Sequence, residues 1–243
     1  MYYFLELFLI LTIFVLPPIF TTESPTLGFV EFNLFHFLIY GFLGIYCFIR
    51  SKNFSEDYKT SENQHKYRWS RDVSLKPLTH LCFGSSNIVE PKSNFLKIIV
   101  FSLITLILLF GNGFLWQWIA KSPSTKLDYS KSIFVHLFQI VGMGLYAFYE
   151  ETMYRNYLQG LISKFLENMV KSPIKEKFRF FVAEILSLLL FAFGHLYMGI
   201  FAVLNALIAG IILRFLVIKT KSIFPSSIVH FIYNLTLYSL MVI

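Results

Sequence analysis

The stretch YEETMYR, residues 149–155, places two adjacent glutamates and an arginine directly after an uncharged run of eighteen residues. On a helix, Glu151 and Arg155 lie four residues apart with the acid nearer the N-terminus, which is the favourable orientation for an ion pair. Glu150 is rotated by about 100° from Glu151 and points elsewhere. The pattern predicts either a salt-bridged helix end, or a division of labour in which Arg155 fixes Glu151 and Glu150 is left free to act as a base.

Two histidine motifs follow in later apolar runs. In FAFGH, Phe191 precedes His195 by four residues, and in HFIYN, His230 precedes Asn234 by the same spacing. Residues four apart share one face of a helix. Taken alone, His195 fits a buried histidine bonded to a backbone carbonyl, and His230 with Asn234 fits a polar contact between membrane helices.

The three motifs indicate chemistry when they are taken together. A charged side chain at membrane depth costs on the order of 2.5–3.5 kcal/mol on insertion scales, so such residues usually face a partner or a cavity. One water-filled cavity shared by all of these side chains would satisfy their hydrogen bonds. Together they supply what peptide hydrolysis needs: a base to activate water, a group to orient that water, and donors to the developing oxyanion.

These residues also carry a resemblance to a known family. E-E-x-x-x-R at residues 150–155, F-x-x-x-H at 191–195 and H-x-x-x-N at 230–234 occur in this order on successive apolar segments. They resemble the signature of the CPBP family, also called the Abi family, which comprises CAAX-type endoproteases and bacteriocin-processing or self-immunity proteins. The segment TKSIFPSSIVHFIYN is similar to that family's approach to its last motif. The resemblance covers roughly residues 130–240, and nothing in residues 1–130 is specific to it.

What the resemblance implies is an intramembrane endopeptidase that hydrolyses a peptide bond in a membrane-associated protein or peptide. The implied roles are water polarisation by Glu150 and His195, oxyanion stabilisation by His230 and Asn234, and support of the site by Glu151 and Arg155. Members of the family have been described both as metalloproteases and as glutamate-dependent proteases without a metal.

Dependence on a metal therefore stays open at this point. Two histidines and a glutamate are a plausible zinc set, which here would be Glu150, His195 and His230. Asn234, however, suits an oxyanion donor better than a zinc ligand, and no H-E-x-x-H motif is present. We expect a reaction without a cofactor, with zinc as the alternative.

The elements that must position these residues are membrane helices. Hydrophobic residues make up 56% of the 243 residues and charged residues 14%, whereas about a quarter of a soluble domain is charged. Several uncharged runs approach or exceed the roughly 17–25 residues of a spanning helix. They are Leu7–Thr22, Phe32–Ile49, Ile98–Ala120, Ser132–Tyr149, Ile185–Leu213 and Ser222–Ile243. The sequence predicts an all-α fold, a polytopic transmembrane helical bundle.

The run at 185–213 is too long for one crossing. Gly194 and Gly199 interrupt it, so we expect helices near 178–197 and 200–218 and about seven spanning helices in all. The first run is short and ends at Pro17-Pro18. A cleaved signal peptide is the alternative there, but a basic leading segment and a small-residue cleavage site are both missing, which favours retention of the helix.

Lysine and arginine determine the expected orientation. The segment 50–97 holds nine of the 21 and the segment 164–179 holds five, whereas three lie between 121 and 131. The positive-inside rule then places the N-terminus in the cytoplasm and the C-terminus outside. We expect a multi-pass protein of the bacterial cytoplasmic (inner) membrane. No nucleic-acid-binding motif is present, and Cys47 and Cys82 do not indicate a disulfide framework.

Two parts are expected along the chain. Residues 1–130 would hold the N-terminal helices and a cytoplasmic loop at 50–93, and residues 131–243 would form the catalytic helical core, with 157–179 as a helix at the membrane interface. The expected boundaries place Glu150 near the cytoplasmic end of its helix and His195 near the outer end of the next. A shared site therefore requires two long helices that turn at Ser172-Pro173.

Alternative functions come from other classes. One is a non-catalytic bacteriocin self-immunity or membrane scaffold protein, and another is a proton-coupled transporter that uses Glu150 and His195. The intact motifs favour the peptidase, because a pure binding protein has no need of all four polar groups. The substrate stays open among prenylated CAAX proteins, leader sequences and C-terminal sorting tails.

Overall fold

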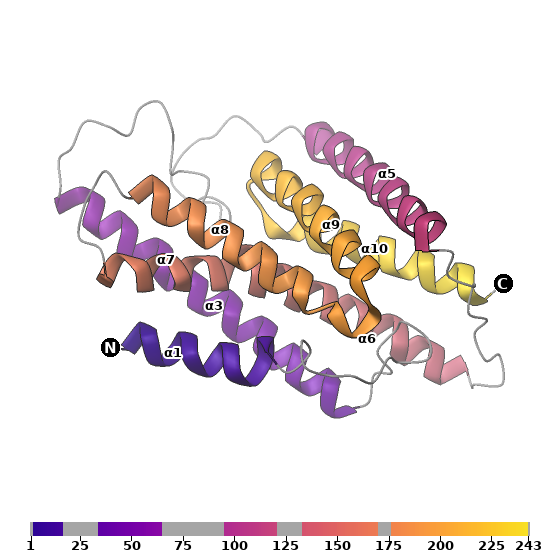
Figure 1. The fold of residues 1–243 in the computed structure, drawn as a ribbon, viewed down its shortest axis with the longest axis horizontal. Coiled ribbons are helices and arrows are strands. Elements are labelled where there is room, and N and C mark those ends of the chain that lie inside the picture. Colours follow the sequence, from indigo (N-terminus) through magenta and orange to yellow (C-terminus); the bar gives the residue numbers. More distant parts are fainter. Residues whose placement is uncertain (1, 17–33, 65–94, 121–132, 170–175, 243) are drawn as a thin grey trace.

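The chain folds as a bundle of helices, as the composition predicts (Figure 1). The computed structural model describes residues 2–16, 34–64, 95–120, 133–169 and 176–242, and these residues contain no strand. The α-helices are α1 (Tyr2–Ile10), α3 (Leu34–Gln64), α5 (Phe95–Ala120), α6 (Ile133–Thr152), α7 (Leu158–Met169), α8 (Glu176–Phe193), α9 (Ile200–Thr220) and α10 (Ile223–Val242). Three short turns complete them: the π-helical turns η1 (Leu11–Val15) and η2 (Met153–Tyr157), and the 3₁₀ turn η4 (Leu196–Met198).

Four helices in the described part are long and apolar enough to cross a membrane. They are Phe95–Ala120, Ile133–Met169, Phe178–Met198 and Ile200–Thr220. The apolar helices Tyr2–Val15 and Phe37–Ser51 are shorter. The protein is therefore an integral membrane helical bundle. The total of about seven crossings stays a prediction, because two of the predicted crossings are described only as these shorter helices and a third, α10, is not among the four.

The predicted interruption of the long run at 185–213 is confirmed. Helix α8 ends at Phe193 and α9 begins at Ile200, with η4 between them. Gly199 precedes α9 with φ +97° and ψ 170°, a backbone conformation that is open to glycine and strained for other residues. This turn places His195 directly after the end of α8.

The segment that carries YEETMYR is one continuous helical rod. α6, η2 and α7 together run from Ile133 to Met169 over 37 residues. The expected separate interfacial helix at 157–179 is therefore wrong in its bounds, because α7 continues the rod and α8 begins at Glu176. Glu150 lies in the middle of the rod rather than at a helix end, and it lies close enough to His195 to interact with it electrostatically. The turn at Ser172-Pro173 lies outside the described residues.

The predicted loop at 50–93 also begins later than expected. Helix α3 continues to Gln64, so the first third of the predicted loop is helical. The segment 65–94, which contains Cys82, lies outside the described residues. Cys47 lies buried within α3 as a free thiol.

The core surrounds the middle of the rod. α6 packs between α3 and α10, α7 packs against α8 and α1, and α9 contacts α5, α8 and α10 (Figure 1). Met153, Tyr157, Leu158 and Leu161 are fully buried in the largest apolar cluster. All five residues of the π-helical turn η2, which begins two residues after Glu151, are buried.

Candidate active site

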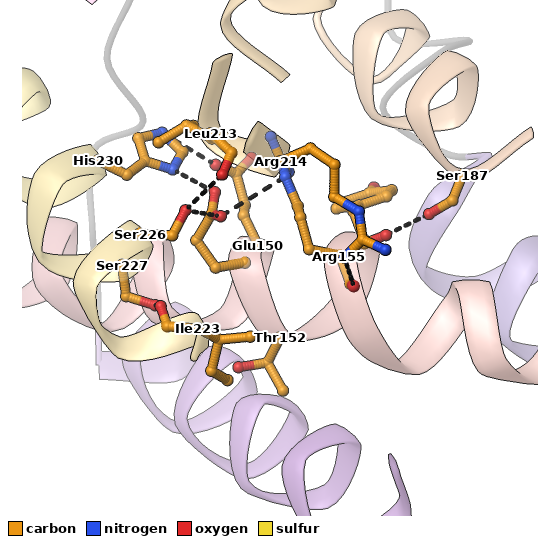
Figure 2. A network of polar contacts seen from close by, with 12 residues as sticks. Glu150, Thr152, Arg155, Ser187, Leu213, Arg214, Ile223, Ser226, Ser227 and His230 are labelled. Atoms are coloured by element: carbon orange, nitrogen blue, oxygen red, sulfur yellow. Dashed lines mark hydrogen bonds and ion pairs between the residues drawn. The ribbon is translucent and has the colours of Figure 1, made fainter. Parts of the chain in front are cut away.

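Glu151 is a fully buried carboxylate with both oxygens engaged. Its Oε1 lies 3.0 Å from Nδ1 of His230, and its Oε2 accepts a hydrogen bond of 2.6 Å from the Ser226 hydroxyl (Figure 2). Nε of Arg155 lies 3.5 Å from the same Oε2, so the predicted i,i+4 ion pair is present. A carboxylate this fully occupied suits a fixed support better than a proton acceptor.

Glu150 is equally buried but has far fewer partners. Its side chain is 3% exposed, and its Oε2 lies 3.6 Å from Nε2 of His230 (Figure 2). The expectation that Glu150 points away from Glu151 is wrong, because both carboxylates face the same imidazole from its two nitrogens. When His230 is an imidazolium, two carboxylates face two cations and the buried cluster carries no net charge.

Helix α10 brings His230 to the glutamates through a short turn. α9 ends at Thr220, and Lys221 follows with a left-handed φ of 54°. The Ser222 hydroxyl accepts a hydrogen bond from the backbone N–H of Phe224 at 3.3 Å, which is an N-terminal cap. The helix that starts here places Ser226 and His230 one turn apart on one face, and both reach Glu151.

Arg155 connects the glutamates to the second histidine motif. Its Cζ lies 3.8 Å from the centre of the Phe191 ring, which is a cation–π contact. Its Nη1 and Nη2 are buried and have no hydrogen-bond partner in the described part of the chain. The guanidinium is thus held by Glu151 on one side and by the aromatic face of Phe191 on the other.

His195 is oriented by the backbone of the same phenylalanine. Its Nδ1 lies 2.9 Å from the carbonyl oxygen of Phe191, and the two rings meet edge to face at 4.9 Å. A carbonyl only accepts, so Nδ1 carries the proton and Nε2 of the neutral ring offers a lone pair. His195 lies close enough to Glu150 and His230 to interact with both electrostatically. The backbone-bonded histidine that the sequence predicts is therefore compatible with a free Nε2.

Asn234 is the predicted site residue that the structure leaves unpaired. It lies on α10 one turn after His230 and is half-buried. Within the described residues, no hydrogen bond joins its side chain to another group of the site. Direct contacts join Glu150, Glu151, Arg155 and His230. His195 is linked to this group through Phe191, and Asn234 is linked only by its position on α10.

The residues were also compared with the requirements of a metal site. In the described part of the chain, no three His, Cys, Asp or Glu side chains are grouped so that they could hold a metal ion. Glu150 and His230 are adjacent, but a zinc site needs at least one further protein ligand. Metal dependence therefore stays a prediction, and the side chains by themselves can supply a base and hydrogen-bond donors.

Sequence reasoning missed Ser226, the hydroxyl donor to Glu151. Its signal was its position, four residues before His230 and therefore on the same helix face. It also missed Glu6 of α1, which accepts hydrogen bonds from Arg50 and from Tyr157 at the end of η2. His136, fourteen residues before Glu150 on α6, instead forms a hydrogen bond of 2.7 Å with the Tyr238 hydroxyl.

Comparison with known families identifies the segment that contains the site. Residues 131–236 match the family described as type II CAAX prenyl endopeptidase Rce1-like. The match includes all three motifs and confirms the resemblance to the CAAX protease family. It supports a CAAX-type intramembrane endopeptidase in general terms. Comparisons with curated proteins and with solved structures gave no match.

Proposed function

On the premise that residues 131–236 are an Rce1-like CAAX endopeptidase segment, we propose that the chain cleaves peptide bonds within the membrane, with Glu150 as the general base. The observation that carries this proposal is the position of His230 between Glu150 and Glu151, with one ring nitrogen facing each carboxylate. Glu151 is fully occupied by its partners. Within the described residues Glu150 has one ion-pair partner, His230, and lies close enough to His195 to interact with it electrostatically. The two glutamates thus have the unequal environments that a base and a support require.

The reaction begins with a water molecule between Glu150 and His195. Glu150 accepts a proton from this water, and the lone pair on Nε2 of His195 orients it. The hydroxide attacks the carbonyl carbon of the substrate, and the carbonyl electrons move onto oxygen. The proton on Glu150 then passes to the leaving nitrogen as the C–N bond breaks, which releases an acid and an amine.

The negative charge that develops on the carbonyl oxygen needs donors. In this proposal the Nε2–H of His230 as an imidazolium and the amide of Asn234, one turn apart on α10, supply them. Glu151 accepts from Nδ1 of His230 and so fixes the ring with Nε2 toward Glu150. Arg155 and Ser226 hold Glu151 in place, which makes the orientation of His230 depend on residues that never touch the substrate.

The proposed substrate is a membrane-associated protein or peptide with a CAAX-type C-terminus. The basis is the description of the matched family as prenyl endopeptidases, and the proposed location is a bacterial cytoplasmic membrane. A burial this deep in a helical bundle suits a substrate that is itself anchored in the bilayer, because such a substrate reaches the site from the lipid.

The test uses the full chain in lipid nanodiscs with a quenched fluorescent peptide that ends in a farnesylated Cys-aliphatic-aliphatic-X sequence. The same peptide without the prenyl group is tested in parallel. Each reaction is repeated with a zinc chelator. The matched control is Glu167→Gln, because Glu167 pairs with Lys164 on α7, away from the site. We expect cleavage by the wild type and by Glu167→Gln, and a loss of about 10²–10⁴-fold in Glu150→Gln.

Two results would contradict this assignment. Equal cleavage by the wild type and Glu150→Gln would remove Glu150 as the base, and loss of activity with chelator followed by recovery with zinc would replace the metal-free reaction. Equal cleavage of the farnesylated and the unmodified peptide would show that the enzyme is a peptidase that does not recognise the prenyl group. A bacteriocin self-immunity protein would instead protect cells equally well with glutamate or glutamine at position 150.

A further inference from the structure

A second group of polar contacts joins η2 to α8 and α9. The Ser187 hydroxyl of α8 donates to the backbone carbonyl of Tyr154, and Nη1 of Arg214 in α9 donates to the carbonyl of Arg155 at 3.1 Å (Figure 2). Nη2 of Arg214 pairs with Oε1 of Glu184. Two neighbouring carbonyls of one turn thus receive side-chain donors from two other helices.

A π-helical turn creates the need for such donors. In η2 the backbone N–H of Leu158 bonds to the carbonyl of Met153, five residues earlier, instead of four. The return to four-residue spacing leaves a carbonyl without a backbone donor, and a buried carbonyl without a donor is costly. Donors from α8 and α9 therefore stabilise the π geometry relative to a regular α-helix.

The π geometry in turn determines where Arg155 points. One extra residue in a turn rotates everything after it by about 100° relative to the helix before it. Glu150 and Glu151 precede η2, whereas Arg155 lies inside it. A regular helix here would keep Arg155 one turn after Glu151, but it would rotate the guanidinium relative to the Phe191 ring of α8.

We propose that Ser187 and the Glu184–Arg214 pair are positioning residues, which hold η2 as a π turn and thereby keep the Arg155 guanidinium against the Phe191 ring. The kinetic part of this inference rests on the proposed peptidase function. The position of the pair agrees with such a role: Glu184 and Arg214 border an apolar groove of about 300 Å³ between α8 and α9. An ion pair in such surroundings has a cost that an apolar pair would avoid.

Three variants separate this role from general stability. Ser187→Ala removes one carbonyl donor with little change in shape. Glu184→Leu with Arg214→Leu removes the pair without leaving an unpaired charge. Glu184→Arg with Arg214→Glu retains an ion pair between α8 and α9, but a glutamate at 214 cannot donate to the Arg155 carbonyl.

The matched control is Asn112→Leu. Asn112 of α5 donates to the backbone and side chain of Asn205 in α9, so its loss also breaks a buried polar contact between helices, but at a distance from η2. The first readout is cleavage of the farnesylated peptide by each variant in nanodiscs. We expect kcat to fall about tenfold for Ser187→Ala and up to about 100-fold for both double variants, with KM within about twofold. Asn112→Leu is expected to retain the wild-type kcat.

The second readout does not depend on activity. Hydrogen exchange of peptides that cover residues 150–160 is expected to rise at least about tenfold in the double variants and to stay unchanged in Asn112→Leu. Recovery of wild-type kcat by the swapped pair would overturn the proposal, since the ion pair alone would then suffice. Unchanged exchange in all three variants would overturn it as well. A wild type that cleaves no peptide would contradict the peptidase assignment and leave exchange to decide the role of the pair.

Discussion

Ser226 and Glu151 come from sequence positions 75 residues apart, and the serine hydroxyl donates to the carboxylate across 2.6 Å inside the bundle. Glu151 receives Arg155 at the same oxygen and His230 at the other. A single fully buried carboxylate thus joins α6, η2 and α10. The orientation of His230 toward Glu150 is a consequence of that junction.

Replacement of Ser226 by alanine tests the junction with a small change in volume. We expect Ser226→Ala to lower kcat severalfold, because Glu151 loses one of the donors that fix it, and to cost about 1 kcal/mol of stability. The adjacent Ser227→Ala is the control, since the Ser227 hydroxyl bonds to the carbonyl of Ile223 within its own helix. Peptide cleavage rates and thermal unfolding in nanodiscs measure both; equal effects of the two substitutions would contradict the role of Ser226.

Replacement of Glu151 by alanine tests the buried ion pair. Its removal leaves Arg155 buried without its carboxylate, and breaking a buried pair in this way costs about 3–5 kcal/mol. We expect Glu151→Ala to lower the free energy of unfolding by that amount, and Glu151→Ala with Arg155→Leu to lower it less. Denaturant titration in micelles measures both. A double variant less stable than the single variant would show that the charge of Arg155 is compensated elsewhere.

Replacement of His195 tests the role of this histidine apart from that of His230. We expect His195→Ala to reduce kcat by about 10²–10⁴-fold, because the lone pair that orients the attacking water is lost. His136→Phe serves as the control, since the hydrogen bond of His136 in the described part of the chain is with Tyr238. Turnover of the farnesylated peptide by the two variants is the measurement. Full activity of His195→Ala would remove this histidine from the reaction.

Replacement of Glu6 tests how the N-terminal helix supports the site. Glu6 accepts from Arg50 at 3.0 and 3.1 Å and from the Tyr157 hydroxyl at 2.8 Å, so α1 is tied to α3 and to the end of η2. We expect Glu6→Ala to destabilise the bundle by about 1–3 kcal/mol, because Arg50 and the buried Tyr157 hydroxyl lose the carboxylate that accepts from both. Glu6→Leu with Arg50→Leu should restore part of that loss in an unfolding titration. An equal loss of unfolding free energy in the single and the double variant would mean that the Glu6–Arg50 pair itself contributes little to stability.

Several features of the molecule could be predicted from the sequence because they depend on spacing along one helix. The Glu151–Arg155 contact is confirmed since residues four apart are neighbours on any α-helix and remain within reach in this rod. The break between α8 and α9 is confirmed since Gly199 adopts a φ that other residues avoid. The bundle itself follows from composition, because long apolar runs enter the bilayer, where a helix satisfies all of its own backbone hydrogen bonds.

The sequence by itself determined which residues could do chemistry and that membrane helices carry them. Only the tertiary structure decided that Glu150 and Glu151 face one histidine rather than opposite directions, and that η2 is a π turn held by Ser187 and Arg214. The physical reason is that a motif determines the face of its own helix, whereas contacts between helices depend on how the helices pack. A single extra residue in a turn, which no motif records, rotates half of the rod by about 100° and changes which side chains meet.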